Sequence, residues 1–569
     1  MMISRASALT AAMACLVAPL PAQVPHLIFN GEELWALSEV APVGDVDGDG
    51  INDLVLGAPF GRFILMGQLI IGGAVQLVSG RDGHLLHPTI FGVGDDIFGF
   101  AVAGAGDFDG DGIPDFVGGS PWSDGFQGEI DVWSGKTGLL ITRIPPPVPP
   151  TGILNFGVTV TGLGDLNSDG FSEVAGTFSD ICDVVIHRGP DGALIRIYRS
   201  SDGSGEPGTG GVGIPDVASL GDVDADGVPD YVIGWHWGDG SGKNGPGLVV
   251  LYSGATGKEV FRVRGADVGG EHLGFSVARM GDMDGDGITD FVAGDPLGLT
   301  VGPDKSGGAA FILSGVDGSL IRRIYGPRSL LFMLGDNFRR VDGGQDVNGD
   351  GVPDLIVGNQ GANPHPGSSG NLEVYSGATG TMLWRVRPNF SGALLGDLNG
   401  DGLSEWAHGD RSRDAPQPQT GQVTVYLGSP GDAHRVCTAK PNSTGRKARL
   451  ELDGPISLRA NQLALYVEHA VPNQSGYFIY GPDLVKRPFG DGVLCAGGGS
   501  LGLRRMGGLI TLDSSGSVLT EIDMNQGEMA SGPAAWTVGS TWTLQFYYRD
   551  PGGAAGFNLS DAMRVTWTP

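Results

Sequence analysis

A short acidic segment recurs seven times along the first three quarters of the chain, and this repeat limits the possible folds more than any other feature. Each copy reads Asp-x-Asp/Asn-x-Asp-Gly-x-x-Asp/Glu, and successive copies are 51 to 64 residues apart. The copies begin at Asp45, Asp107, Asp165, Asp222, Asp282, Asp346 and Asp397. A period of this length is too long for helical solenoid repeats, and it fits one four-stranded blade of a β-propeller with its loops.

The segments around each acidic copy have the composition of β-strands. Apolar, β-branched or aromatic runs follow the acidic residues, for example at residues 54–56, 231–233 and 355–357. A second strand-like run follows in most copies and ends in a glycine turn, as at residues 248–257. No helical periodicity runs through this region. We therefore predict an all-β fold, with a seven-bladed β-propeller over residues 23–430.

The two ends of the repeat region indicate how the ring of blades closes. The seventh unit has its acidic loop and the strand of residues 421–427, but no returning strand follows residue 428. Residues 26–31 resemble residues 88–92, which precede the second unit. We expect residues 26–30 to supply the outer strand of the last blade, because closure removes exposed sheet edges.

Composition limits the partners of the chain. The 101 glycines and 36 prolines among 569 residues approach the content of disordered chains, but 40% of the residues are hydrophobic, which favours a folded protein. Turns between strands account for the glycines. With 35 basic and 64 acidic residues, the net charge is −29. This charge excludes nucleic acids and anionic membrane surfaces as partners, because both need a basic face.

The acidic loops have the ligand chemistry of calcium. Carboxylates at positions 1, 3, 5 and 9 converge, the glycine at position 6 permits the turn, and position 7 lends a backbone carbonyl. Oxygen donors without cysteine or histidine favour calcium over transition metals. The alternative, solvated Asp-Gly turns, leaves the repulsion among the 25 loop acids unexplained. We predict about seven structural calcium ions, which change the formal charge from −29 to −15. The predicted ligands are Asp45, Asp47, Asp49, Ile51, Asp53, Asp107, Asp109, Asp111, Ile113, Asp115, Asp165, Asn167, Asp169, Phe171, Glu173, Asp222, Asp224, Asp226, Val228, Asp230, Asp282, Asp284, Asp286, Ile288, Asp290, Asp346, Asn348, Asp350, Val352, Asp354, Asp397, Asn399, Asp401, Leu403 and Glu405.

These units resemble FG-GAP repeats, the blades of the integrin-α-type seven-bladed β-propeller. The motifs that carry the resemblance are Phe98-Gly99 and Phe156-Gly157 before loops two and three, and Gly57-Ala58-Pro59, Gly119-Ser120-Pro121 and Gly294-Asp295-Pro296 after loops one, two and five. Units four, six and seven lack a clean copy of either motif. The resemblance implies a propeller with calcium loops and a partner-binding face opposite those loops, and it does not imply an activity.

The first 22 residues have the pattern of a secretory signal peptide. A basic start is followed by the apolar run of residues 6–20 and by a small residue, Ala22, at a cleavage position. A membrane anchor needs a longer apolar run, and a lipid anchor at Cys15 is an alternative. The uncharged stretch of residues 63–80 is expected to form a β-strand in its second half. We therefore expect a secreted, periplasmic or cell-surface protein, without a transmembrane segment in the mature chain.

The repeat stops near residue 431, and the composition changes. Apolar runs at residues 463–467, 477–480 and 542–548 are separated by glycine, proline and asparagine turns, so we predict a small C-terminal β-sandwich over residues 431–569. Four cysteines are too few for a disulfide scaffold of this size. In an oxidising compartment Cys437 and Cys495, which lie in this module, form a possible disulfide, and Cys182 stays single as a small buried hydrophobic residue.

No catalytic motif is present, and the catalytic residues, if any exist, are unknown. The chain has no His-Glu-x-x-His, no Gly-x-Ser-x-Gly and no phosphate loop. We expect a monomeric extracellular binding or adhesion protein whose partner is a protein or a glycan. The alternatives are a polysaccharide lyase or hydrolase on a propeller scaffold, and a structural cell-surface component. The candidate ligand-binding residues are Trp122, Trp235, His236, Trp237, Lys243 and Arg411. In a competing interpretation, Trp235 and Trp237 pack between blades and bind no ligand.

Overall fold

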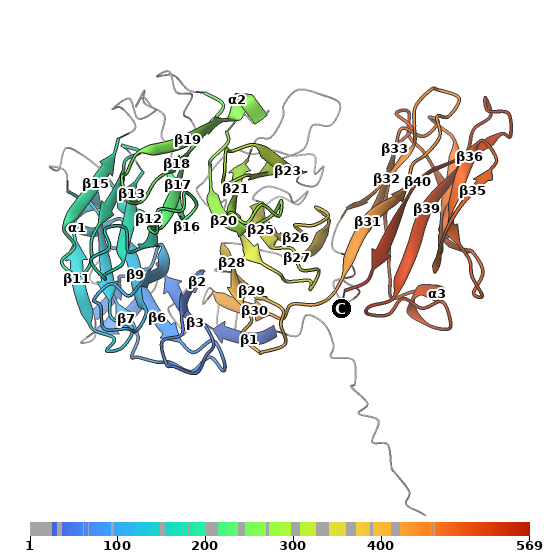
Figure 1. Ribbon diagram of the computed structural model, residues 1–569. Helices are drawn as coiled ribbons and strands as arrows, with labels where there is room; N and C mark the ends of the chain where they lie inside the picture. The colour runs from blue at the N-terminus through green and yellow to red at the C-terminus, as the bar shows by residue number, and fades with distance from the viewer. Residues whose placement is uncertain are drawn as a thin grey trace, which may run out of the picture.

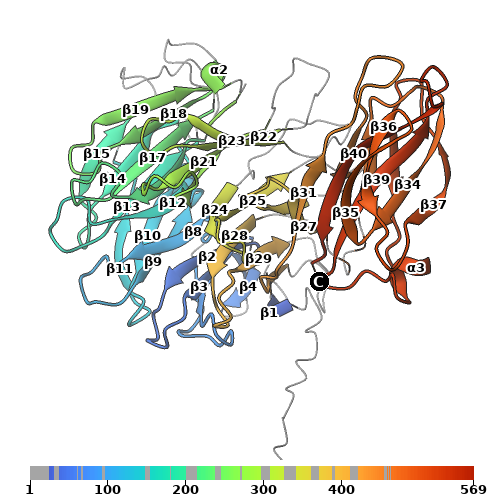
Figure 2. The same cartoon turned by 45° about the vertical axis from the view of Figure 1, so that its right-hand side comes forward.

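Seven four-stranded antiparallel sheets form the larger part of the molecule. The structure, a computed structural model, describes residues 25–30, 37–60, 62–65, 68–92, 96–147, 154–179, 181–199, 214–236, 245–268, 272–296, 308–325, 341–359, 371–386, 391–410, 421–453, 456, 458, 461 and 463–568. The sheets stand around a common centre as the blades of a propeller, and a β-sandwich lies beside them (Figures 1 and 2). The all-β fold class predicted from the repeat is therefore confirmed.

Each blade uses four strands in chain order, except the last, and in blade one two further strands lie between the second and the third. Blades one to three are β2 (Glu39–Gly44), β3 (Asp53–Ala58), β6 (Ala74–Val78) and β7 (Ile90–Phe91); β8 (Val102–Gly106), β9 (Asp115–Ser120), β10 (Glu129–Trp133) and β11 (Leu140–Ile144); and β12 (Phe156–Gly164), β13 (Glu173–Phe178), β14 (Val184–His187) and β15 (Leu194–Tyr198). Blades four to six are β16 (Asp216–Gly221), β17 (Asp230–Trp235), β18 (Leu248–Tyr252) and β19 (Glu259–Arg264); β20 (Val277–Gly281), β21 (Asp290–Asp295), β22 (Ala309–Leu313) and β23 (Leu320–Tyr325); and β24 (Val341–Gln345), β25 (Asp354–Asn359), β26 (Asn371–Tyr375) and β27 (Met382–Val386). Blade seven is β28 (Ser391–Gly396), β29 (Glu405–Asp410), β30 (Gln422–Tyr426) and β1 (Pro25–Asn30).

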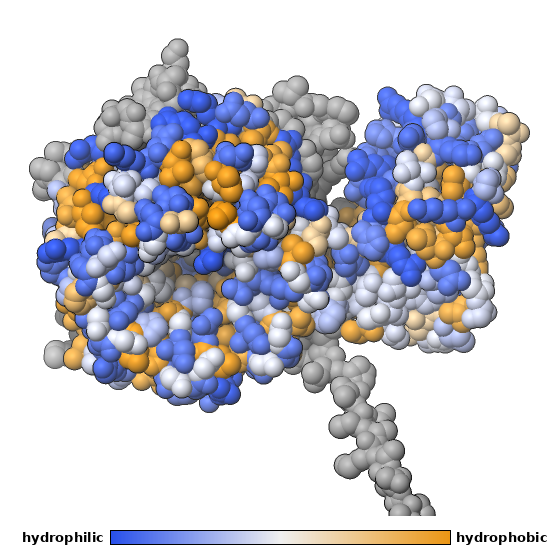
Figure 3. Space-filling view, viewed as in Figure 1, coloured by the Kyte–Doolittle hydropathy of each residue, from blue (hydrophilic) through white to orange (hydrophobic). Residues whose placement is uncertain are grey.

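The first strand of every blade lines a central channel, and the acidic loop follows that strand. A cavity of about 470 Å³ at the centre is lined by residues of the seven first strands, and Figure 3 shows the propeller hollowed there. The second strand of every blade is buried over its described length, apart from the half-buried Val357 of β25, because both of its faces pack on neighbouring blades. All seven acidic loops therefore lie on one face of the propeller.

The ring closes through a strand from the N-terminal end of the chain. β1 pairs antiparallel with β30, with Leu27 opposite Val425 and Asn30 opposite Gln422. Leu27 and Phe29 pack against the buried apolar residues shared by blades one and seven. The predicted closure by residues 26–30 is thus confirmed, and it covers the outer edge of blade seven.

Glycines allow neighbouring blades to approach closely, which explains the Phe-Gly and Gly-Ala-Pro pairs. A Cβ atom on Gly57 of blade one would lie 2.4 Å from the carbonyl oxygen of Gly99 in blade two. The same contact joins Gly119 of blade two to Gly157 of blade three, at 2.0 Å. A side chain at these positions would force the blades apart.

One hairpin was not anticipated from the sequence. The first half of the uncharged stretch of residues 63–80 lies largely in β4 (Arg62–Leu65) and β5 (Gln68–Ile71), which pair only with each other among the described strands. The second half contains β6, the strand that was predicted. The hairpin extends from the face of the propeller opposite the acidic loops, since it joins the second and third strands of blade one.

The C-terminal region is a β-sandwich, as predicted. One sheet has the order β31 (Asp432–Cys437), β40 (Phe557–Thr566), β39 (Thr541–Arg549), β34 (Ser475–Gly481) and β37 (Arg504–Thr511). The other has the order β32 (Arg449–Asp453), β33 (Ala464–Glu468) and β38 (Val518–Glu521), and β35 (Asp483–Phe489) pairs with β36 (Gly492–Gly497). The structure joins Cys437 and Cys495 in a disulfide, with Cα atoms 6.4 Å apart. Cys182 is single but only half-buried, against the expectation of a buried residue.

The sandwich packs against blade six. The outer strand of that blade, β27, is buried, and its Leu383 and Trp384 belong to the same apolar cluster as Trp567 of the sandwich. The hydroxyl of Thr379 donates to Asp432 at 2.8 Å, and Thr381 donates to the carbonyl of Ala433. Both views show β31 close to this blade (Figures 1 and 2). The two parts of the chain thus share an apolar junction.

Candidate metal centres

Each acidic loop is held in shape by hydrogen bonds from its own backbone, as the fourth loop illustrates. The first carboxylate, Asp222, accepts N–H bonds from Asp226 at 3.0 Å and from Gly227 at 2.9 Å. Asp226 accepts an N–H bond from Val228 at 2.9 Å. The glycine at position 6 has φ between +83° and +91° in all seven loops, a conformation that other residues rarely adopt. The turn that the sequence predicts at this glycine is confirmed.

The last acid of each loop is buried and accepts hydrogen bonds from the backbone. In the fourth loop one oxygen of Asp230 accepts N–H bonds from Val223 at 2.8 Å and Asp224 at 3.1 Å, and the other accepts from Gly254 at 2.8 Å. The equivalent acid is 0% exposed in all seven loops, and each accepts an N–H bond from the second residue of its loop at 2.5 to 2.8 Å. A carboxylate has about four acceptor sites, so one remains for a cation.

In four loops the structure brings three predicted ligands together. The first, third and ninth residues each offer a carboxylate oxygen, and these oxygens lie within 4.8 Å of one another. The groups are Asp45, Asp47 and Asp53; Asp107, Asp109 and Asp115; Asp222, Asp224 and Asp230; and Asp282, Asp284 and Asp290. Charges this close repel one another strongly without a cation, and the donors are the hard oxygens that Ca²⁺ prefers. These clusters fit a divalent metal ion.

The other three loops have asparagine at the third position. The amide nitrogen of Asn167 donates to Glu173, and that of Asn399 donates to Glu405, both at 2.9 Å. The amide of Asn348 donates to the fifth residue of its loop at 3.1 Å. Half a turn of each amide would present its oxygen in place of its nitrogen. These loops thus offer the same donor atoms after a side-chain rotation.

Burial raises the pKa of the ninth residue in every loop, because the charged form loses its hydration. The pKa is raised to about 6 for Asp115, to about 7 for Glu173 and Glu405, and to about 8 for Asp354. The backbone N–H bonds oppose this shift. A divalent cation beside the carboxylate would offset the cost of its burial.

In two loops a basic side chain approaches the acid at position 5. Arg81, in the turn after β6, donates to the carboxylate of Asp49 and, at 2.8 Å, to its carbonyl oxygen. The Nζ atom of Lys136 lies 3.4 Å from Asp111. Both basic side chains are more than half exposed. They neutralise part of the charge of loops one and two and would compete there with a metal ion.

The sequence matches a known repeat family. A family profile described as "FG-GAP repeat" matches residues 38–73, 98–133 and 337–375, which contain parts of the first, second and sixth repeats. The chain is an FG-GAP repeat protein. The resemblance carried by Phe98-Gly99 and Gly57-Ala58-Pro59 is therefore confirmed. The third match falls on a repeat without a clean copy of either motif, so the acidic loop and its strands carry the similarity there.

This FG-GAP repeat protein is similar to integrin α chains over part of its length. It is 33% identical to integrin alpha-6 of Homo sapiens over 168 residues, which are 28% of this chain and 14% of that protein. It is 29% identical to integrin alpha-V of Gallus gallus over 276 residues, 42% of this chain and 25% of that protein. The matched segment thus spans a quarter or less of these relatives.

The candidate ligand-binding residues have different surroundings. Trp122 is 42% exposed on the face opposite the acidic loops, in the connection that contains α1 (Ser123–Phe126), and its ring centroid lies 5.7 Å from that of Phe126. Trp235 and His236 are buried, and the indole N–H of Trp235 donates to the carbonyl of Cys182 at 3.4 Å. These two residues therefore pack inside the propeller. Trp237, Lys243 and Arg411 lie outside the described residues.

Sequence reasoning missed Phe126, which completes an aromatic pair on this face. It is 43% exposed, and its carbonyl accepts N–H bonds from Leu154 and Asn155 at 2.9 Å each. Asp124, Gly125 and Phe126 all have positive φ, so an unusual turn presents the ring. The signal available in the sequence was an aromatic residue four positions after Trp122 within a connection between strands.

The helices among the described residues are α1, α2 (Gly265–Val268) and α3 (Gly527–Ala530), each four residues long. None of them is long and apolar enough to cross a membrane.

Proposed function

We propose that this chain is an extracellular binding protein of the adhesion type, whose propeller is stabilised by calcium in its acidic loops. The observation that carries the proposal is the convergence of three carboxylates in each of four loops, on one face of an integrin-α-like propeller. The opposite face presents the connections between second and third strands, including the exposed pair of Trp122 and Phe126. Metal and partner would then occupy opposite faces.

The proposed metal is calcium, with about seven ions per chain. All seven loops supply only oxygen donors, and 25 of the 64 acidic residues of the chain lie in them. Seven divalent ions would reduce the formal charge from −29 to −15. The large and flexible coordination shell of Ca²⁺ suits loops whose third residue is aspartate in four cases and asparagine in three.

The proposed location is outside the cytoplasm, after removal of residues 1–22 as a signal peptide. The disulfide between Cys437 and Cys495 supports this location, because disulfides persist in oxidising compartments. We propose that residues 23–430 and 431–569 act as two domains joined at blade six. No observation in the described residues favours an enzymatic role over binding.

Two measurements test the proposed function. The first is metal analysis with a calcium titration of the full chain, for which we expect about seven ions and a marked loss of thermal stability with chelator. One ion or none would contradict the metal assignment. The second is a pull-down and glycan-array screen with calcium present, comparing the wild type with Trp122→Ala and a matched control, Leu139→Ala.

The control has a clear basis in the structure. Leu139 is 67% exposed in the same blade as Trp122, but it lies in the turn before β11, on the side of the acidic loops. We expect Trp122→Ala to lose partner capture and Leu139→Ala to keep it. Equal capture by both variants would exclude the face around Trp122 as the partner site. Release of sugar products from a polysaccharide panel would instead favour an enzyme.

A further inference from the structure

The charge of the chain is divided unevenly between its two parts. Residues 431–569 contain 12 basic and 12 acidic side chains, so all of the net charge of −29 lies in residues 1–430. The charge of the whole chain therefore does not describe the sandwich, which can present a basic surface of its own. Such a surface lies on the outer face of the larger sheet, the face turned away from the core of the sandwich.

A pair of stacked tyrosines stands on this outer face. Phe478 and Phe546 belong to the buried core, so the residues before and after them in their strands point outwards. Tyr477 of β34 and Tyr547 of β39 lie directly opposite each other, and their rings stack with centroids 4.8 Å apart. Each tyrosine thus occupies a ring face of the other, and the hydroxyl ends point away from the sheet.

Two arginines flank the tyrosine pair. Arg505 of β37 has its guanidinium carbon 4.1 Å from the ring centroid of Tyr477 and donates to the hydroxyl of that tyrosine at 3.3 Å. Arg549 follows Tyr547 by two residues on β39, so it shares the outer face. Burial and the neighbouring Tyr477 raise the pKa of Tyr547, whereas both arginines lower it. Both guanidinium groups therefore act on the hydroxyl of Tyr547.

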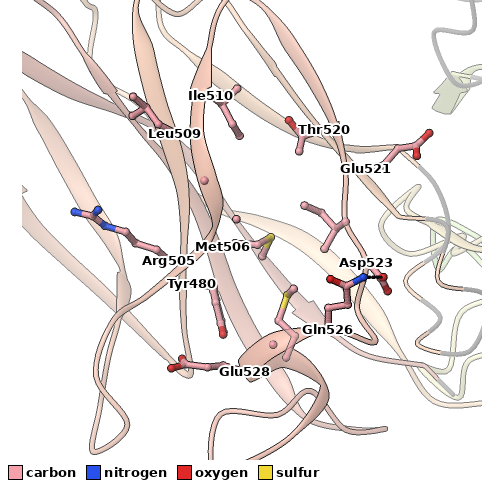
Figure 4. A pocket seen from close by; sticks show the side chains of 15 residues that line it. Tyr480, Arg505, Met506, Leu509, Ile510, Thr520, Glu521, Asp523, Gln526 and Glu528 are labelled. Atoms are coloured by element: carbon pink, nitrogen blue, oxygen red, sulfur yellow. Dashed lines mark hydrogen bonds between the residues drawn. The ribbon is translucent and has the colours of Figure 1, made fainter.

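The side chain of Arg505 belongs to the outer face and not to the interior. A cavity of about 410 Å³ lies on the inner side of β37, next to β38 and α3, and Tyr480 and Met506 are among the residues that line it. In Figure 4 the side chain of Arg505 points away from these groups. Its charge is thus presented on the outside of the sandwich.

The hairpin of β35 and β36 extends this surface. Leu494 of β36 belongs to the apolar cluster that joins the hairpin to the sheet, and Arg487 of β35 lies directly opposite it. Residues opposite each other on paired strands project to the same side, so Arg487 projects toward the sheet. Two residues further on, Phe489 is 43% exposed, and its ring centroid lies 5.2 Å from that of Phe557, the residue opposite Arg549.

The three arginines of this surface are exposed, and their charges are not neutralised. Within the part of the chain that the structure describes, Arg487, Arg505 and Arg549 form no ion pair with a carboxylate. Arg505 uses one N–H on a neutral hydroxyl, and a guanidinium has five. The acid of the hairpin turn, Asp491, accepts N–H bonds from Ala555 at 3.1 and 2.9 Å. The surface therefore favours a negatively charged partner.

We propose that this outer face binds an acidic polysaccharide, whose carboxylate or sulfate groups meet the three arginines and whose hydroxyl groups bond to the two tyrosine hydroxyls. A single exposed ion pair contributes little, so a polymer with repeated charges is held where one small anion is not. The exposed ring of Phe489 offers apolar surface to one face of a sugar.

Two other acidic partners fit this surface less well. Single-stranded nucleic acid binds through bases that stack on open ring faces, and the facing sides of Tyr477 and Tyr547 are already filled. An acidic peptide could add a strand beside β35, which pairs only with β36 among the described strands. Pro488 and the register shift between Leu484 and Arg487 disfavour pairing at that edge.

Binding of labelled hyaluronan and dextran sulfate fragments to the full chain tests this proposal, with uncharged dextran of equal length as the matched probe. Fluorescence anisotropy at fixed calcium gives the affinity. We expect a charged polymer to bind, with an affinity that falls as salt rises, and dextran not to bind. Binding of hyaluronan would identify uronate carboxylates as the recognised groups, and binding of dextran sulfate alone would identify sulfates.

Single variants locate the polymer on the sandwich. Arg505→Gln and Arg549→Gln should each lower the affinity roughly 3- to 10-fold, the upper range for one exposed charge contact. Tyr547→Phe keeps the ring stack and removes a hydroxyl without a protein partner among the described residues, so we expect a loss of roughly 2- to 10-fold. Lys258→Gln is the control, because it removes the same charge from an exposed side chain of the propeller.

The proposal fails if neither charged polymer binds through the millimolar range of repeat units, or if dextran binds as well. It also fails if the arginine variants bind as Lys258→Gln does. Tighter binding of single-stranded DNA or of polyglutamate would identify a different class of partner and overturn it. Thermal unfolding of each variant checks its fold. Trp122→Ala should bind these polymers as the wild type does, so the outcomes do not bear on the proposed function.

Discussion

The acids at positions 9 and 5 of one loop should have separable roles, because they have different surroundings. In the fourth loop Asp230 is 0% exposed and accepts three backbone N–H bonds, whereas Asp226 is exposed and its carboxylate accepts one. We predict that Asp230→Asn destabilises the loop with and without calcium. Asp226→Asn should destabilise the loop only in the presence of calcium, because this change removes a predicted metal ligand and little else.

The magnitude follows from the hydrogen bonds. An asparagine at position 230 can still accept from Val223 and Asp224, but its amino group then faces the N–H of Gly254, where the aspartate accepts a bond at 2.8 Å. Losing a bond to a charged acceptor and leaving a buried donor unpaired costs about 2–4 kcal/mol. This cost corresponds to local opening that is roughly 30- to 900-fold more frequent.

Hydrogen exchange measured by mass spectrometry gives the required local readout, since thermal unfolding of two joined domains is not a two-state process. The segments to follow are residues 221–230 and 248–257, in chelator and in excess calcium. In chelator we expect these segments to exchange much faster in Asp230→Asn than in the wild type, and we expect Asp226→Asn to exchange at the wild-type rate. Wild-type exchange in Asp230→Asn would refute the role of the buried acid. Equal acceleration of both variants in chelator would refute the separation of roles.

Three further predictions concern other parts of the fold. A chain that begins at residue 32 lacks β1 (Pro25–Asn30) and exposes the edge of β30, so it should self-associate, which size-exclusion chromatography will detect; monomeric elution would contradict this. Burial lowers the pKa of His187, whose ring donates to the carbonyl of Gly192 at 2.8 Å. The unfolded chain therefore binds this proton more tightly, so the free energy of unfolding is full above the unfolded pKa of about 6.5 and decreases as the pH falls below it. His187→Gln should reduce this acid-dependent fall in melting temperature at fixed calcium, and an unchanged profile would exclude His187 as its cause. The disulfide closes a segment of 58 residues, so replacing Cys437 and Cys495 by alanine should cost about 4 kcal/mol, visible as a lower urea midpoint of the sandwich while the propeller midpoint stays unchanged.

The repeat made the propeller predictable because each copy supplies the same local instructions. The acidic loop, its glycine and the strand that follows recur at a blade-sized period, so seven equivalent sheets are the simplest arrangement that buries all the strands. The closing strand was predictable for a related reason. Residues 26–30 resemble the outer-strand region before the second unit, and only the last blade lacked such a strand.

Other features depend on contacts that no local pattern encodes. The hairpin of β4 and β5 belongs to one connection only, so the repeat gives no information about it. The orientation of Trp235 follows from the packing of blade four on blade three, where its N–H reaches Cys182. The sandwich cavity draws on β34, β37, β38 and α3, which are separated along the chain and carry no motif.

The hydrogen bonds of the acidic loops also bear on how much a metal ion can contribute. The first and ninth carboxylates of the fourth loop already accept backbone N–H bonds, so the turn keeps its geometry through its own contacts. A cation would therefore bind donors that are largely positioned, and its free energy would offset repulsion and burial of charge rather than order the chain. Since the same arrangement recurs around the ring, loss of calcium should loosen every blade at the turn between its first two strands, while the sheets stay paired. The expected ion-free state is thus a less stable propeller and not an unfolded chain.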